Sequence, residues 1–263
     1  MKPYCLASSS AGNCFIFEFE VNGIPTRIMV ECGIPLKDIY NKASSYNIDI
    51  SSIKACLITH SHGDHCRAAR DIARIGIPIF ATQPTLEALN IKGEELVELT
   101  KTKLCDGIYL LPFAVEHDCP GSVGFIIRTH SETVVFINDH KRWLNDLRNF
   151  KPNYVFIECN YDHKVVYAQY YALKKKLDTC SSISRSEYLE IKTKLAQHER
   201  NLNSHCSLNG TLKGLKKLNL SQCSAIFLLH LSDRYANEYR MKNEIQKQTK
   251  ILTYVAQKIG GFK

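Results

Sequence analysis

The sequence predicts an α/β protein in which two β-sheets are covered by helices on their outer faces. Short apolar or alternating runs dominate the chain up to Ile137, helical stretches separate the later strands, and two groups of strands follow one another directly. At 263 residues the chain can bury a sizeable core. We therefore expect one domain over residues 1–263, with a helical insertion at about 162–203.

The individual elements follow from hydrophobic periodicity and turn residues. Strands are expected at residues 14–20 and 27–30, joined by a turn at Asn22-Gly23, and at 54–58, 77–80, 108–115, 123–128, 133–137, 154–158 and 225–229. Helices are expected at residues 66–75, 83–90, 141–150, 162–203, 208–218 and 237–250. Pro84 fits the first turn of the second helix, where its missing N–H has no helical partner.

Composition narrows the classes of protein. No apolar run approaches the roughly 20 residues that span a bilayer, and the first residues lack the apolar core of a secretory signal. We therefore expect a cytoplasmic protein without membrane contact. The 11 cysteines include no C-x-x-C pair, which favours buried thiols over disulfides or a zinc knuckle. The net charge of +8 favours an anionic partner, although much of it is dispersed along the chain.

A dense group of metal-binding residue types follows the strand expected at 54–58. Three histidines and one aspartate occupy six positions, from His60 to His65. A single histidine at such a place would usually be structural, but four such side chains at one strand end predict a zinc-type site. Gly63 is expected to let the backbone turn sharply between the two pairs.

This H-x-H-x-D-H pattern resembles the signature of the metallo-β-lactamase superfamily, whose fold is an αββα sandwich. The resemblance extends over about residues 4–235, because later strand ends carry the expected His, Asp and His. It implies two zinc ions, with manganese as the alternative, bound by seven residues: His60, His62 and His117 for the first ion, Asp64, His65 and His230 for the second, and Asp139 as the bridge.

One position departs from the family. Where the family usually has a strand-end D-x-G whose Asp supports the ligand histidines, this chain has Glu31-Cys32-Gly33. Glu31 can still accept an imidazole N–H from outside the ligand set, with a longer side chain.

Three further segments resemble exonuclease-like members of the superfamily and the anti-Pycsar phosphodiesterases: residues 6–14, 158–162 and 204–209. The resemblance implies hydrolysis of 3′,5′-cyclic mononucleotides to linear ones, in phage counter-defence. The alternative is a metal-dependent exonuclease or other nuclease of the same superfamily, and a second alternative is a thioester or lactone hydrolase. A non-enzymatic binding module fits poorly, since no ligand is missing.

The same segments supply the remaining site residues. His205 and Asp64 are the expected catalytic residues, and His205, Ser207, Asn209 and Asn13 are expected to bind substrate. The competing interpretation is structural, because Ser207 and Asn209 are ordinary caps for the helix at 208–218, and a Ser/Gly-rich turn needs no ligand.

The insertion is rich in tyrosine. Tyr167, Tyr170 and Tyr171 share one helix face, which either packs against protein or stacks a base. We expect a homodimer with the insertion near the active site and a small anionic nucleotide as substrate. Nucleic acid is a partner only in the exonuclease alternative.

Overall fold

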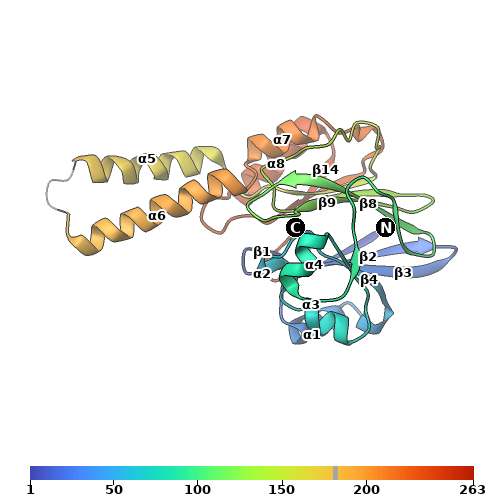
Figure 1. Ribbon diagram of the computed structural model, residues 1–263. Helices are drawn as coiled ribbons and strands as arrows, with labels where there is room; N and C mark the ends of the chain where they lie inside the picture. The colour runs from blue at the N-terminus through green and yellow to red at the C-terminus, as the bar shows by residue number, and fades with distance from the viewer. Residues whose placement is uncertain (180–182) are drawn as a thin grey trace.

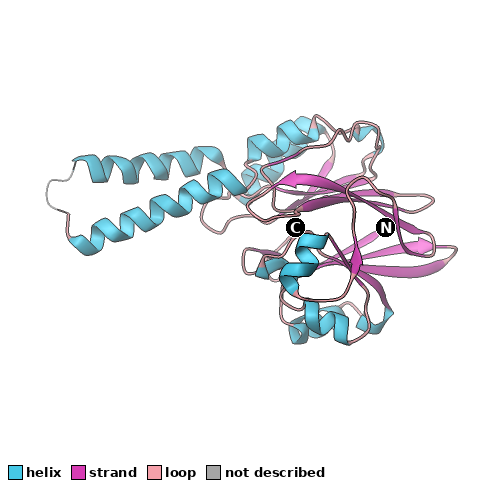
Figure 2. Ribbon diagram, in the orientation of Figure 1, coloured by secondary structure: helices cyan, strands magenta, loops and turns pink. Residues whose placement is uncertain are grey.

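The computed structural model describes residues 1–179 and 183–263. Two mixed sheets face each other, and helices cover their outer faces, as Figure 2 shows. The predicted fold class, an αββα sandwich, is confirmed. Among the described residues, none of the helices combines the length and the apolar character that a bilayer span requires.

The first sheet has the strand order β1-β2-β3-β4-β5-β6. Its first three strands are antiparallel, and β3 to β6 run parallel. Its strands are β1 (Lys2–Ser9), β2 (Gly12–Val21), β3 (Ile24–Cys32), β4 (Ile53–Leu57), β5 (Ile79–Ala81) and β6 (Glu94–Glu95). Its helices are α1 (Leu36–Ser45), α2 (Gly63–Cys66), α3 (Ala69–Arg74) and α4 (Gln83–Leu89), with a 3-10 turn, η1 (Ile50–Ser52).

The second sheet has the order β11-β8-β9-β10-β12-β13-β14, and β7 pairs with β8. The neighbours β10, β12, β13 and β14 run parallel, so their carboxyl ends meet at one edge. Its strands are β7 (Thr102–Cys105), β8 (Ile108–Glu116), β9 (Val123–Arg128), β10 (Thr133–Ile137), β11 (Arg142–Trp143), β12 (Tyr154–Glu158), β13 (Ala225–Leu229) and β14 (Leu252–Val255). The covering helices are α7 (Leu208–Leu215) and α8 (Glu238–Thr249), with a 3-10 turn, η2 (Leu220–Gln222).

Phenylalanine side chains fill the space between the sheets. Phe17 of β2 lies 4.6 Å from Phe156 of β12, centroid to centroid, and Phe156 stacks on Phe227 of β13 at 4.3 Å. Residues 15, 17 and 19 alternate with residues of the opposite face, as the period of a strand requires. Because aromatic side chains bury large areas, this layer holds the two sheets together face to face.

Some elements differ from the prediction. Residues 141–150 were expected to be helical, but they form β11 and a loop, because Trp143 pairs with Val115 of β8. The helix expected at 66–75 is two short helices, α2 and α3. The strands β1 and β14 and the helix α1 were not predicted. Buried residues on both faces of β1 remove the alternation that would have revealed it.

The insertion forms a helical arm, made of α5 (His163–Thr179) and α6 (Arg185–Ser204), that projects from the body (Figure 1). Residues 180–182 lie outside the described residues. Ser184 caps α6 by accepting a hydrogen bond from the N–H of Glu187. At the base, Val166 packs on Tyr161 and Tyr235, and Arg240 forms an ion pair with the buried Asp162. Tyr170 contacts α6, where its hydroxyl donates to Glu199, whereas Tyr167 and Tyr171 remain 44% and 63% exposed.

Two glycines near the histidine cluster have different roles. A Cβ on Gly33 would lie 1.7 Å from the carbonyl oxygen of Asp64, so this glycine lets the first sheet approach α2. Gly63 begins α2, and no atom lies within 4 Å of a Cβ placed there. Gly63 therefore provides no unusual turn, contrary to the expectation, and Gly33 is the sterically required position.

We expect Gly33→Ala to lower the free energy of unfolding by about 1–3 kcal/mol or more, because backbone atoms must move to admit the methyl group. Gly63→Ala is the matched control and should leave stability unchanged or slightly raised. Denaturant midpoints of the two variants test this. Equal midpoints would show that the Gly33 contact relaxes without cost.

Candidate metal centre

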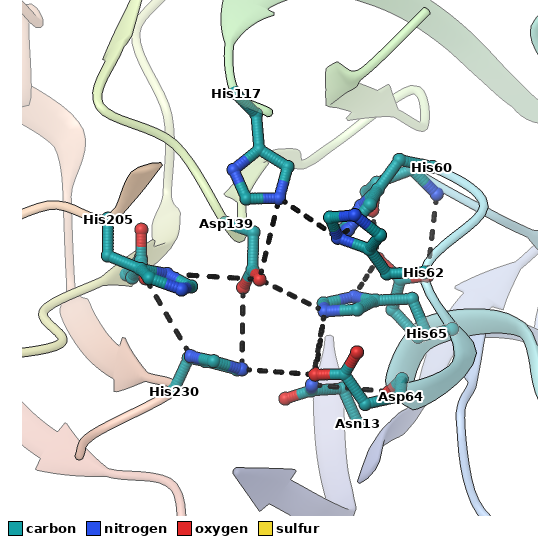
Figure 3. A network of polar contacts seen from close by, with 12 residues as sticks. Asn13, His60, His62, Asp64, His65, His117, Asp139, His205 and His230 are labelled. Atoms are coloured by element: carbon teal, nitrogen blue, oxygen red, sulfur yellow. Dashed lines mark hydrogen bonds and ion pairs between the residues drawn. The ribbon is translucent and has the colours of Figure 1, made fainter. Parts of the chain in front are cut away.

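Three imidazoles converge beyond the end of β4. His60 and His62 come from the loop after this strand, and His117 follows β8. Nε2 of His60 lies 3.0 Å from Nδ1 of His62, which in turn lies 3.2 Å from Nε2 of His117 (Figure 3). These three nitrogens face one point between the two sheets.

A second group lies beside the first. Nε2 of His65 and Nε2 of His230 each lie 3.4 Å from Oδ2 of Asp64. His65 belongs to α2 and His230 follows β13, so the group joins the two sheets. With Asp139 the group has four members, and their donor atoms all lie within 4.8 Å of one another.

Asp139 lies between the two groups. Its Oδ2 is 3.3 Å from Nε2 of His65 and 3.9 Å from Nε2 of His117, and its Oδ1 is 3.6 Å from Nε2 of His230. Burial opposes ionisation, but the surrounding imidazoles outweigh it and hold the pKa of Asp139 well below its ordinary value. Asp139 thus faces both groups, and the bridging role expected for it stays a prediction.

The donor atoms fit metal ions. In a tetrahedral zinc site with bonds of about 2.0–2.1 Å, neighbouring ligand atoms lie about 3.3 Å apart. The spacings of 3.0–3.4 Å found within the two groups agree with this. Moreover, Oδ1 of Asp139 is buried and has no hydrogen-bond partner among the described residues. Buried lone pairs that face one another in this way are suited to cations.

Glu31 supports the histidines from the first sheet. It is fully buried, with Oε1 3.2 Å from Nδ1 of His65. The hydroxyl of Thr59 donates to the same carboxylate and lies 2.9 Å from Nδ1 of His60. Burial raises the pKa of Glu31 although His65 lowers it. The longer side chain of glutamate therefore reaches both histidines, one directly and one through Thr59.

Asn13 has a supporting position. It is buried, and its amide nitrogen donates to the carbonyl oxygens of Ser9 at 3.0 Å and Asp64 at 3.3 Å. The same nitrogen lies 3.3 Å from Nε2 of His65. The amide nitrogen of Asn13 therefore fixes the loop that carries the ligands. Asn13 does not line the cavity beside the metal-binding groups, so its binding of substrate stays a prediction without support from the structure.

Ser207 and Asn209 also lie elsewhere than expected. The hydroxyl of Ser207 caps α7 by accepting from the N–H of Gly210, and Asn209 is exposed with its amide 3.3 Å from His163. Neither residue lines the cavity beside the metal-binding groups. Ser207 is therefore the cap that the structural interpretation expected, whereas Asn209 lies inside α7 and does not cap it. Substrate binding by these two residues stays a prediction that the cavity lining does not support.

His205 reaches the site from the end of α6. Its Nδ1 lies 2.6 Å from Oε1 of the buried Glu158, and its ring stacks on His230 with centroids 5.2 Å apart. Burial lowers the pKa of His205, but Glu158 outweighs this and raises it to about 9. The contact with Glu158 therefore favours the protonated ring, in which Nε2 is a second donor.

Glu158 is the main residue that sequence reasoning missed. It ends β12, and its second oxygen accepts from the backbone N–H groups of His140 at 2.8 Å and Cys206 at 3.1 Å. The carboxylate therefore connects three parts of the chain behind the metal-binding groups. An isolated acid at the end of an apolar strand was the available signal, and it was noted only as part of a motif.

His117 is oriented by the helical arm. Its Nδ1 lies 3.0 Å from the carbonyl oxygen of Ser204, the last residue of α6, so the ring donates there and directs Nε2 to the site. A cavity of about 370 Å³ opens beside both groups. Its walls combine metal-binding residues with Gln197, Arg200 and Asn201 of α6.

The fold and this His/Asp centre define a metal-dependent hydrolase. Residues 26–170, more than half of the chain, match the family model described as the beta-lactamase superfamily domain, and the chain belongs to this family.

Relatives and solved structures agree with this assignment. Exodeoxyribonuclease WalJ of Streptococcus pneumoniae is 25% identical over 187 residues, which cover 66% of this chain and 68% of that protein. Exodeoxyribonuclease YycJ of Bacillus anthracis is 21% identical over 234 residues, 82% of this chain and 86% of that protein. The metallo-β-lactamase fold protein YhfI from Bacillus subtilis has a TM-score of 0.66 at 12% identity, covering 99% of this chain and 98% of its own. WalJ and YycJ are named as exodeoxyribonucleases and not as cyclic-nucleotide phosphodiesterases.

We expect close to two transition-metal ions per chain in protein purified without chelator. His60→Ala and Asp139→Ala should each lower this number, and Asp139→Ala more, because its two oxygens face both groups. Elemental analysis of folded protein measures the ratio. Two ions retained in Asp139→Ala would contradict the bridging role.

We expect His205→Ala to keep its metal and lose about 10²–10⁴-fold in turnover, the usual effect of removing a general acid or base. Ser207→Ala is the matched control two residues away. Loss of its cap should cost about 1 kcal/mol of stability and leave the turnover of folded protein intact. Loss of metal in His205→Ala would instead assign this residue to the metal-binding groups.

Proposed function

We propose that this protein is a dinuclear zinc phosphodiesterase that degrades DNA from its ends, which was the alternative in the sequence analysis. The observation that carries the proposal is the likeness to two exodeoxyribonucleases, one of them over 82% of this chain. The His/Asp centre beside an open cavity supports it. Zinc is the proposed ion because five of the seven donors are imidazoles and two are carboxylates, a set that suits zinc.

The residues divide the chemistry between them. Two bound divalent ions would supply a nucleophile at neutral pH and neutralise charge on the phosphate. Protonated His205 faces the same cavity, and we assign it the proton that the leaving oxygen needs. Glu158 orients this ring through Nδ1 and favours its charged form. Asp64 belongs to the second metal-binding group, and its role is to hold that ion close to the reacting phosphate.

The cyclic mononucleotide, the first substrate in the sequence analysis, has no comparable support among the relatives named above. The homodimer expected from the tyrosine-rich insertion stays a proposal, and the exposed Tyr167 and Tyr171 are the surface that a second copy would cover.

The test is to incubate zinc-loaded protein with end-labelled linear DNA, circular single-stranded DNA, cyclic mononucleotides, a thioester and a lactone. We expect mononucleotides from linear DNA and no cleavage of circles, because an exonuclease needs an end. Asp139→Ala, prepared in parallel, controls for contaminating nucleases. Hydrolysis of cyclic mononucleotides alone would overturn the proposal in favour of the other phosphodiesterase, and cleavage of circles would indicate an endonuclease.

A further inference from the structure

The last turns of α6 are fixed against the metal centre. The carbonyl oxygen of Ser204 lies 3.0 Å from Nδ1 of His117, and the hydroxyl of Ser204 donates to the carbonyl oxygen of Arg200 at 2.7 Å. Arg200 lies one helical turn before Ser204. The contact between Ser204 and His117 therefore sets the position of Arg200 along the cavity. The arm therefore brings a particular set of side chains to the site.

Arg200 is one of three α6 residues in the cavity wall, with Gln197 and Asn201. Among the described residues that line this cavity, it has the one guanidinium or ammonium group. The same lining includes Asp64, Asp139 and four imidazoles, those of His62, His117, His205 and His230. A substrate drawn to the metal ions by negative charge would meet Arg200 at the edge of the same space.

The contacts of Arg200 leave most of its donors available. Its Nε lies 3.2 Å from Oδ2 of Asp118, and the side chain is 68% exposed. In the described part of the chain, neither terminal nitrogen donates a hydrogen bond that would have to break. An ion pair this exposed is weak. A planar fork of N–H groups suits the paired oxygens of a phosphate.

Asp118 links Arg200 to the metal centre. While Oδ2 contacts Arg200, Oδ1 lies 3.2 Å from Nε2 of His117 and 3.8 Å from Nε2 of His62. One carboxylate thus separates the guanidinium from the first group of imidazoles. The guanidinium and the first group of imidazoles therefore contact opposite oxygens of the same carboxylate.

We propose that Arg200 binds the non-bridging oxygens of the substrate phosphate, so that the arm supplies a phosphate-binding residue to the metal centre. The inference rests on the proposed phosphodiester substrate. Asp118 contacts only Nε of Arg200, so the phosphate would meet the two terminal nitrogens. Arg200 contacts substrate and product phosphate alike, so its main effect is on binding rather than on the rate of the chemical step.

The test measures binding of inorganic phosphate to zinc-loaded protein by calorimetry, which needs no turnover. We expect Arg200→Ala to bind phosphate about 10- to 100-fold more weakly, the usual loss for hydrogen bonds to a charged group. The phosphate affinity of Arg200→Lys should lie between those of the wild type and Arg200→Ala, because an ammonium keeps the charge but lacks the planar pair of N–H donors. Lys194→Ala removes one positive charge from the same helix, where it pairs with Glu190, and should bind like the wild type.

Kinetics on bis(p-nitrophenyl) phosphate provide the second measurement. Arg200→Ala should raise KM by a similar factor with kcat changed little. Unchanged phosphate affinity in a fully metallated Arg200→Ala would overturn the inference. So would loss of zinc in this variant, because Arg200 would then act through Asp118 on the metal-binding groups. Failure to degrade DNA, with phosphate binding that still depends on Arg200, would refute the exonuclease proposal and leave this inference standing.

Discussion

The site depends on the convergence of seven side chains, rich in unshared electron pairs, at one edge between the two sheets. Burying such groups without positive charge is unfavourable, which is why the centre favours cations. The surroundings of His65 likewise favour positive charge. Asp139 and Glu31 outweigh the effect of burial and raise the pKa of His65 well above its ordinary value. The phenylalanine layer between the sheets holds the strand ends in place against this cost.

Two buried glutamates organise the centre from opposite sides. Glu31 lies one residue before the end of β3 in the first sheet and reaches His65 and, through Thr59, His60. Glu158 ends a strand of the second sheet and holds His205. Each carboxylate lies outside the set of seven metal ligands and contacts an imidazole nitrogen of the site. Such contacts commonly fix the orientation of histidine rings in metal sites. The two sheets thus contribute both the ligands and their support.

The helical arm is more than an addition to the surface. Its second helix ends at Ser204, whose carbonyl oxygen orients His117, and continues directly into His205. Asn201, Arg200 and Gln197 extend the same helix along the cavity. Because one helix carries a ligand support, the proposed proton donor and the proposed phosphate contact, a displacement of the arm would alter all three together.

The sequence by itself determined the fold class and the metal centre, because strand ends and the spacing from His60 to His65 are local patterns that place donors at one edge. The resemblance to the metallo-β-lactamase superfamily then pointed to His117, Asp139 and His230 at later strand ends. Only the tertiary structure showed what Glu158, Asn13 and Ser207 contact, and only it placed Arg200 in the cavity wall. A polar side chain can cap a helix, support a ligand or face a substrate, and the choice depends on which distant backbone lies within hydrogen-bonding range. Residues 141–150 show the same limit, since pairing of Trp143 with β8 overrode a helical pattern.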